Sequence, residues 1–153
     1  MANQDQLNKI KQGSSYWNNW VNNNRNIIIF DLSKADLRGK KLNGIFLSKA
    51  DLSNAKLDGA KLDGATLEGA NLESAQLEAA NLSKANLEGA NLSNANLTGA
   101  KFSQANLKGA NLSNANLLAA DLSHANLTGA NLSNSNLDGA NLNGAIGYLG
   151  KLD

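Results

Sequence analysis

The hydrophobic pattern of this chain has a period of five residues over most of its length. From Leu32 to Leu142 every fifth residue is leucine, except for Phe102, which makes 23 consecutive units. Alanine stands two residues before the central residue in 19 of these units. The four other units hold different residues at that position: Phe30, Lys40, Ile45 and Ser135. Most units therefore combine one large and one small apolar side chain with polar or glycine positions.

A period of five residues excludes both regular secondary structures as the basis of the repeat. On an α-helix, at about 100° per residue, successive leucines would lie about 140° apart, so no apolar stripe would form. On a flat strand, side chains alternate with a period of two, so successive leucines would face opposite sides. A shared interior therefore requires a corner in every unit, and repeated corners in one direction predict an all-β solenoid.

A longer self-similarity predicts the number of corners in each coil. The sequence Asn-Leu-Ser-Asn-(Ala/Ser)-Asn-Leu begins at Asn91, Asn111 and Asn131, so the closest self-match has a spacing of 20 residues, or four units. Residues 20 apart would then be stacked neighbours in the same environment. We expect nearly six four-sided coils that form a rod about 27 Å long, with strands about 4.8 Å apart.

The residues after each central position predict the turns at the corners. Glycine at the second of these positions suits a type II turn, which needs a positive φ there. Asparagine suits either another turn class or the left-handed region. We expect mostly type II turns on the faces that carry Leu37 and Leu47, and mostly other turns on the face that carries Leu32.

Asparagines 20 residues apart are expected to align along the outside of the rod. Their amides would bond along the rod and either stabilise the fold or form a flat recognition surface. The predicted ladders are Asn71, Asn91, Asn111 and Asn131; Asn86, Asn106 and Asn126; and Asn96, Asn116 and Asn136.

The segment before the repeats has apolar residues at helical spacing. They are Leu7, Ile10, Trp17, Trp20 and Val21. Gly13 divides the segment into two predicted short helices. An open coil end exposes apolar side chains and unpaired backbone groups, so we expect these helices to cover it. The predicted organisation is a helical cap over residues 1–25, a β-helix over 26–145 and a short tail over 146–153.

The larger side chains of the first coil are expected to fill the gap below this cap. Ile27 fits the leucine register one unit earlier, and Phe46 stands at an outward position where it can pack against the helix. The stem of Lys40 is expected to lie along the apolar end, with its ammonium group in water.

The tail offers apolar residues for the opposite end of the rod. Tyr148, Leu149 and Leu152 either fold over Leu137 and Leu142 or are buried against a second molecule. The two expected states in solution are therefore a monomer with a short cap and a weak end-to-end homodimer.

The repeat resembles the pentapeptide-repeat family, whose consensus is A-(D/N)-L-X-X. It is seen here as Ala90-Asn91-Leu92-Ser93-Asn94 and as Ala50-Asp51-Leu52-Ser53-Asn54, and the similarity covers residues from about 30 to 145. The resemblance implies a right-handed quadrilateral parallel β-helix. The family is abundant in cyanobacteria, and most members have no established activity. A subset inhibits DNA gyrase by resembling duplex DNA in size and charge, which makes a topoisomerase inhibitor the alternative function.

The composition argues against an enzyme or a cofactor-binding protein. There is no cysteine and one histidine, His124, at an outward corner, so no nucleophile with a base and no set of metal ligands is expected. No apolar run is long enough to span a membrane. The absence of a targeting segment favours the cytoplasm.

Charge is distributed unevenly along the chain, although the net charge is only +1. Residues 1–50 carry 8 basic and 3 acidic residues, residues 51–90 carry 3 and 7, and residues 91–153 carry 3 of each. Basic residues of the first coil lie over different faces, so direct binding of nucleic acid is not expected: Lys34, Arg38, Lys40, Lys41 and Lys49.

Acidic residues of the middle segment lie mostly just after the central leucine, on consecutive corners. They predict a belt around the rod that either keeps the surface solvated or forms an interaction surface for a protein partner. The belt consists of Asp58, Asp63, Glu68, Glu73, Glu78 and Glu88. The sequence therefore predicts a non-enzymatic module for protein interaction, with an unidentified partner and no metal or cofactor.

Overall fold

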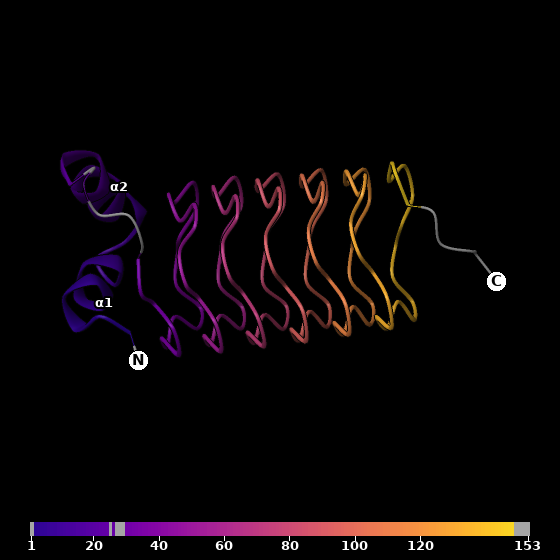
Figure 1. Ribbon diagram of the computed structural model, residues 1–153, viewed down its shortest axis with the longest axis horizontal. Helices are drawn as coiled ribbons and strands as arrows, with labels where there is room; N and C mark the ends of the chain where they lie inside the picture. The colour runs from indigo at the N-terminus through magenta and orange to yellow at the C-terminus, as the bar shows by residue number, and fades with distance from the viewer. Residues whose placement is uncertain (1, 25, 27–29, 149–153) are drawn as a thin grey trace.

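The computed structural model describes residues 2–24, 26 and 30–148. Two helices, α1 (Gln4–Ile10) and α2 (Ser14–Asn23), lie at one end of a stack of similar coils (Figure 1). Parallel bridges join residues 20 apart throughout the stack, from Asp31↔Asp51 to Asn126↔Ile146. Residues four units apart are therefore neighbours, as the self-similarity of the sequence predicts. In the described part, each side of a coil contributes an isolated bridge instead of a longer strand.

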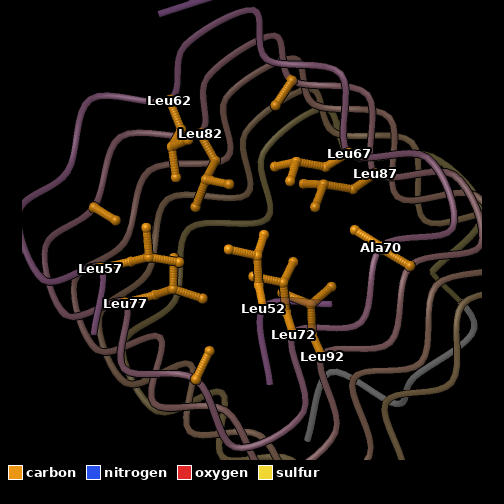
Figure 2. Packing of buried hydrophobic residues seen from close by; sticks show 14 of the residues in the cluster. Leu52, Leu57, Leu62, Leu67, Ala70, Leu72, Leu77, Leu82, Leu87 and Leu92 are labelled. Carbon is orange, nitrogen blue, oxygen red and sulfur yellow. The ribbon is translucent and has the colours of Figure 1, made fainter. Parts of the chain in front are cut away.

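The interior of the stack is a continuous apolar core. From Leu32 to Leu127 every central residue is at most 1% exposed, and the alanines from Ala35 to Ala125 are at most 2% exposed. Leucines of successive coils lie above one another and point inward, as Leu52, Leu72 and Leu92 do in Figure 2. The expected shared interior of leucine and alanine is thereby confirmed.

Hydrogen bonds between coils use almost all of the backbone donors. In the unit 90–94, four of the five N–H groups bond to backbone carbonyls of the same or a neighbouring coil. The fifth, of Ser93, donates to Oδ1 of Asn91 at 3.2 Å. The equivalent bond joins Ser113 to Asn111 at 3.1 Å. An asparagine or aspartate before the central leucine therefore satisfies the one donor that the coil ladder does not use.

All corners share one backbone conformation at the second residue after the central one. From Lys34 to Gly144 this residue has a positive φ, between +53° at Ala79 and +70° at Gly144. The Leu32 face, where the sequence favours other turns, has the same positive φ, for example +60° at Asn94. The expectation of a different turn on this face is wrong, because every corner must close the same hydrogen bond and continue the same ladder.

The shared corner conformation predicts opposite effects for two substitutions in one column. Ala119 has a φ of +55°, so Ala119→Gly is expected to raise the free energy of unfolding by about 1 kcal/mol, the left-handed penalty less the added entropy of the unfolded chain. Gly99→Ala should lower it by a similar amount, although a Cβ there would meet no atom within 4 Å. Urea denaturation measures both. The opposite order, with Gly99→Ala more stable than Ala119→Gly, would show that the corners are unstrained.

The two helices contact the open edge of the first coil. Trp17 is fully buried, and its Nε1–H donates to the carbonyl of Phe46 at 2.7 Å. Asn18 donates to the carbonyl of Gly44 at 2.9 Å and accepts the N–H of Phe46 at 2.8 Å. The Asn3 N–H donates to the carbonyl of Asp31 at 2.8 Å. The helical segment thus pairs with the carbonyls of Asp31, Gly44 and Phe46 and with the N–H of Phe46, at the edge of the first coil that has no preceding coil.

The side chains at this junction follow the predictions in part. Phe30 is buried, and its ring meets the edge of Trp17 at a centroid distance of 5.1 Å. Lys40 is exposed, as expected for an ammonium group in water. Phe46 contacts α2 through its backbone, but its side chain remains 40% exposed. Ile27 lies outside the described residues. Neither described helix is long and apolar enough to cross a membrane, and the cytoplasmic location stays a prediction.

The other end of the core is open. Leu132, Leu137 and Leu142 are only half-buried, whereas the leucines of the preceding coils are covered on both sides. The Ser135 hydroxyl, a polar group at an inward position, donates to the carbonyl of Leu132 at 2.7 Å. Gly147 stands where the next leucine would be, and a Cβ there would lie 2.4 Å from Cα of Thr128. Glycine at this position therefore lets the chain leave the coil.

Candidate interaction surface

The acidic belt surrounds the rod and does not form one surface. Each face is named here for its first central residue. The six carboxylates are distributed over all four faces: Asp58 and Glu78 on the Leu37 face, Asp63 on the Leu42 face, Glu68 and Glu88 on the Leu47 face, and Glu73 on the Leu32 face. A flat partner can therefore contact only some of them at once.

Half of the belt carboxylates are held by neighbouring coils. Asp58 Oδ1 accepts the backbone N–H of Glu78 at 3.1 Å, and Asp63 accepts the side-chain amide of Asn43. Glu88 accepts the Asn106 amide at 3.2 Å and pairs with Lys108 at 3.2 Å. These three acids stabilise contacts between coils.

The other three belt carboxylates point into solvent on successive corners. Glu68, Glu73 and Glu78 are exposed, and within residues 30–148 their carboxylates make no hydrogen bond or ion pair. Because they occupy three consecutive units, they lie on three different faces of the rod, namely the Leu47, Leu32 and Leu37 faces. They are the part of the belt whose charge a partner can use, and this role stays a prediction.

Two of the predicted asparagine ladders form, and the third does not. Amide hydrogen bonds link Asn91 to Asn71, Asn111 to Asn91 and Asn131 to Asn111 at 3.2–3.3 Å. A second ladder runs along the Leu47 face through Asn86, Asn106 and Asn126, at 3.1 and 3.4 Å.

The third column aligns through backbone bridges only. Asn96, Asn116 and Asn136 are stacked neighbours. The amide of Asn116, however, donates to Oγ1 of Thr98 at 3.0 Å. The Thr98 hydroxyl in turn donates to Oδ1 of Asn96 at 2.7 Å. A hydroxyl beside the column competes for the amide and interrupts the ladder.

The amide ladders mainly stabilise contacts between coils. Oδ1 of Asn91 and of Asn111 accepts one bond from a backbone N–H and one from the amide of the next coil. The carbonyl oxygen of each amide is therefore already engaged, which leaves mainly an amide hydrogen for a partner. From Asn91 to Asn134 the Leu32 face has no charged side chain. This geometry favours stabilisation over recognition for the ladders.

The aspartate at the start of the first ladder column accepts two hydrogen bonds from Ser33. The Ser33 hydroxyl and backbone N–H both donate to Oδ1 of Asp31, at 2.7 and 3.1 Å, and these bonds lower the pKa of Asp31. A lowered pKa in the folded state adds stability above the ordinary carboxyl pKa of about 4, and that stability is lost as the pH falls through the folded value.

Asp31→Asn is therefore expected to change how stability depends on pH. Near neutral pH the variant should have a lower free energy of unfolding than the wild type. This deficit should disappear as the pH falls below about 4, because the protonated wild type no longer benefits from the charge. Urea denaturation at a series of pH values between 3 and 7, on the scale of carboxyl titration, measures the difference. A deficit that is constant over this range would contradict a charge-dependent contribution from Asp31.

Metal ligands do not come together among residues 2–24, 26 and 30–148. No group of three or more histidine, cysteine, aspartate or glutamate residues could hold a metal ion there. His124 is exposed, as predicted, and its ring covers Gly144, where a Cβ would lie 2.4 Å from Nδ1.

The described part of the tail and the last coils line a hollow at the end of the core. A cavity of about 330 Å³ is lined by Gly129, Ala130, Leu132, Ser135, Leu137, Gly147 and Tyr148. The sequence indicated Tyr148 as a covering residue, and its half-buried ring lies against this end. Leu149 and Leu152 lie outside the described residues.

Solved structures with similar sequences share the repeat. Rfr23, a pentapeptide-repeat protein from the cyanobacterium Cyanothece 51142, is 44% identical over 56% of this chain and 58% of its own, with a TM-score of 0.56. HetL, a pentapeptide-repeat protein involved in heterocyst differentiation regulation in the cyanobacterium Nostoc sp. strain PCC 7120, is 35% identical over 80% and 76%, with a TM-score of 0.28. QnrB1, a plasmid-mediated fluoroquinolone resistance protein, is 22% identical over 76% and 68%, with a TM-score of 0.48.

The likeness to Rfr23 is partial, since the match spans 58% of that protein's length. No curated protein sequence matches the chain significantly. The profile described as pentapeptide repeats (8 copies) matches residues 31–69, 70–109 and 105–144, which is well over half of the chain. Pentapeptide repeats form right-handed quadrilateral β-helices, and the 20-residue coils of this structure agree with that architecture. The chain belongs to the pentapeptide-repeat family.

Proposed function

We propose that this protein is a non-enzymatic module that binds another protein through the outer faces of a rigid rod. The rod would consist of nearly six coils over residues 26–145, with residues 1–25 as its cap and 146–153 as a short tail. Support comes from the core, in which the leucines and alanines of the central coils are buried against one another. Most chemical differences between coils lie in the outward columns, although Phe102 and Ser135 also vary the inward positions.

The exposed carboxylates of the belt are the contact surface in this proposal. Glu68, Glu73 and Glu78 combine exposure with the absence of any described partner, whereas the other belt acids are used between coils. A basic surface on a partner would be attracted to these three side chains. The rigid coil backbone would fix the positions from which these side chains extend, so that binding would order the side chains but not the backbone.

Comparison of matched charge variants tests this surface. The variant Glu68→Gln/Glu73→Gln/Glu78→Gln should lose interactors that the wild type enriches from its native host, while thermal unfolding stays unchanged. The control Lys101→Gln alters an exposed lysine farther along the rod that has no ion pair with a described residue. A candidate partner should then bind the purified wild type and the control equally, and the belt variant at least tenfold more weakly. Equal binding by all three proteins would reject the belt as the contact surface.

Inhibition of a type II topoisomerase is the alternative, and the distribution of charge argues against it. Lysines stand among the acids on the faces, for example Lys56, Lys61 and Lys84, so no face presents the continuous negative charge of DNA. We therefore expect no inhibition of supercoiling by purified gyrase at micromolar protein. Inhibition in that range would make topoisomerase inhibition the better-supported function.

The open end of the core bears on the predicted states in solution. An end-to-end dimer would cover the half-buried Leu137, Leu142 and Tyr148, whereas a monomer leaves them in contact with water. Sedimentation equilibrium of the wild type over a range of concentrations distinguishes the weak dimer from the monomer.

A further inference from the structure

An open recess lies where the helical segment meets the first coil. Its volume is about 540 Å³, within the range of small-molecule sites, and it is lined by Lys11, Asp36, Arg38 and Lys40. We propose that this recess binds a small anion with two or more phosphate groups, of the diphosphate class.

Lys40 is the first observation. It occupies a position that is alanine in 19 of the 23 units, so the core does not require a lysine there. Its side chain is exposed instead of buried, and it lines the recess. The ammonium group of Lys40 is therefore available to a ligand outside the core.

Lys11 reaches the recess from a different element. It is the residue that follows α1, in the turn before Gly13, where φ is +99°. The buried side chains of Ile10 and Trp17 fix this turn against the coil. Lys11 is exposed and has no ion pair with a described residue. Two lysines separated by 29 positions in the chain are thus brought to one recess by the packing of the helices.

Arg38 is held in place by Asp36. The guanidinium donates from Nε to Oδ1 at 2.9 Å and from Nη2 to Oδ2 at 2.7 Å, a two-point contact that orients its plane. This hydrogen bonding lowers the pKa of Asp36 to about 2, so the carboxylate stays charged near neutral pH. The remaining N–H groups of Arg38 are free of Asp36 and can donate to phosphate oxygens.

The charge of the lining selects for a multivalent anion. Three positive side chains and one negative one leave two net positive charges in the recess. Beyond the lining, Lys56 acts on Asp36 and Asp58 acts on Arg38, so the nearest outside charges have opposite signs and leave the net charge of the lining in place. Such a field favours diphosphate over chloride or acetate, while the lysines and the arginine supply the donors that phosphate oxygens accept.

Titration with inorganic pyrophosphate tests the site in the full-length protein. We expect saturable binding by isothermal titration calorimetry at low ionic strength, with amide shifts in NMR spectra centred on Lys11 and on Arg38 to Lys40. Lys40→Ala and Lys11→Ala should each weaken binding by about five- to tenfold, and the double variant should abolish it. Lys40→Ala restores the alanine of the other repeats, so its folding is expected to be intact.

Three controls make the result decisive. Lys101→Ala, which removes an exposed lysine on a distant coil, should bind pyrophosphate as the wild type does. The belt variant Glu68→Gln/Glu73→Gln/Glu78→Gln should also bind normally, so that failure of the interaction surface and failure of this site are told apart. Equal binding of citrate would overturn the phosphate assignment. Unchanged binding by the double variant, or no binding by the wild type, would overturn the site.

Discussion

Trp17→Ala is expected to lower the free energy of unfolding by about 3–5 kcal/mol, as is usual for a large aromatic side chain removed from a core. Trp17 is fully buried, with its ring 5.2 Å from that of Trp20 and 5.1 Å from that of Phe30, measured between centroids. The variant also leaves the carbonyl of Phe46 without its indole donor. The loss of packing and the loss of a hydrogen bond at the coil edge therefore act together.

The neighbouring aromatic residue provides the control. Tyr16 is 48% exposed on the same helix, so Tyr16→Ala should change stability by no more than about 0.5 kcal/mol. Denaturation in urea measures both variants. Deletion of residues 1–25 extends the test, because it exposes the whole apolar end and should cause self-association detectable by sedimentation. A monodisperse truncated protein with unchanged stability would contradict the capping role of the helices.

The second large effect is expected at the centre of the rod. Leu97→Ala should lower the free energy of unfolding by about 2–5 kcal/mol, because the residue is fully buried and the coils on both sides prevent the cavity from closing. Leu137 provides the matched control, since it lies two coils along the same column but is only half-buried at the open end. Leu137→Ala should cost clearly less.

Comparison of the two leucine variants tests the solenoid itself. Both remove the same atoms from the same column, so a difference in stability measures how far the next coil covers the site. Chemical denaturation, followed by circular dichroism, gives the two values. Equal losses would mean that the end of the rod is covered as completely as its centre, for example by self-association, which the dependence on protein concentration would show.

The core was predicted well from the repeat because each unit has the same pattern of apolar and polar residues. The five-residue period and the 20-residue self-similarity identify which residues face inward and which are stacked, and Leu92 and Ala90 lie where that pattern places them. Phe102 also faces inward, in the column of Leu82 and Leu122. Stacked identical units leave few alternatives, since any slip would carry leucines to the surface.

Turn type was predicted less well because tertiary structure overrides local preference. Glycine and asparagine suggest different turns when each corner is considered alone. In the stack, a corner with alanine or histidine adopts the same positive φ as one with glycine, as Ala119 and His124 show. The coil-to-coil hydrogen bonds compensate for the local cost of about 1–2 kcal/mol.

The candidate sites depend still more on three-dimensional packing. The sequence shows the acidic belt as one group, and the structure divides it into acids that bond between coils and three that remain exposed. The third asparagine column is interrupted by Thr98, a competition between side chains that spacing alone does not reveal. The recess of Lys11, Arg38 and Lys40 depends on how the turn after α1 is placed against the first coil.

The sequence by itself determined the solenoid, its four-unit coil and the identity of its core, because a strict period carries that information in every unit. Only the tertiary structure decided which donors, charges and cations have partners. Those partners come from the coil above, the coil below or the helices at the end, and their geometry depends on stacking instead of on local spacing. The chemistry of the surface is therefore a property of the assembled rod, whereas its shape is a property of the repeat.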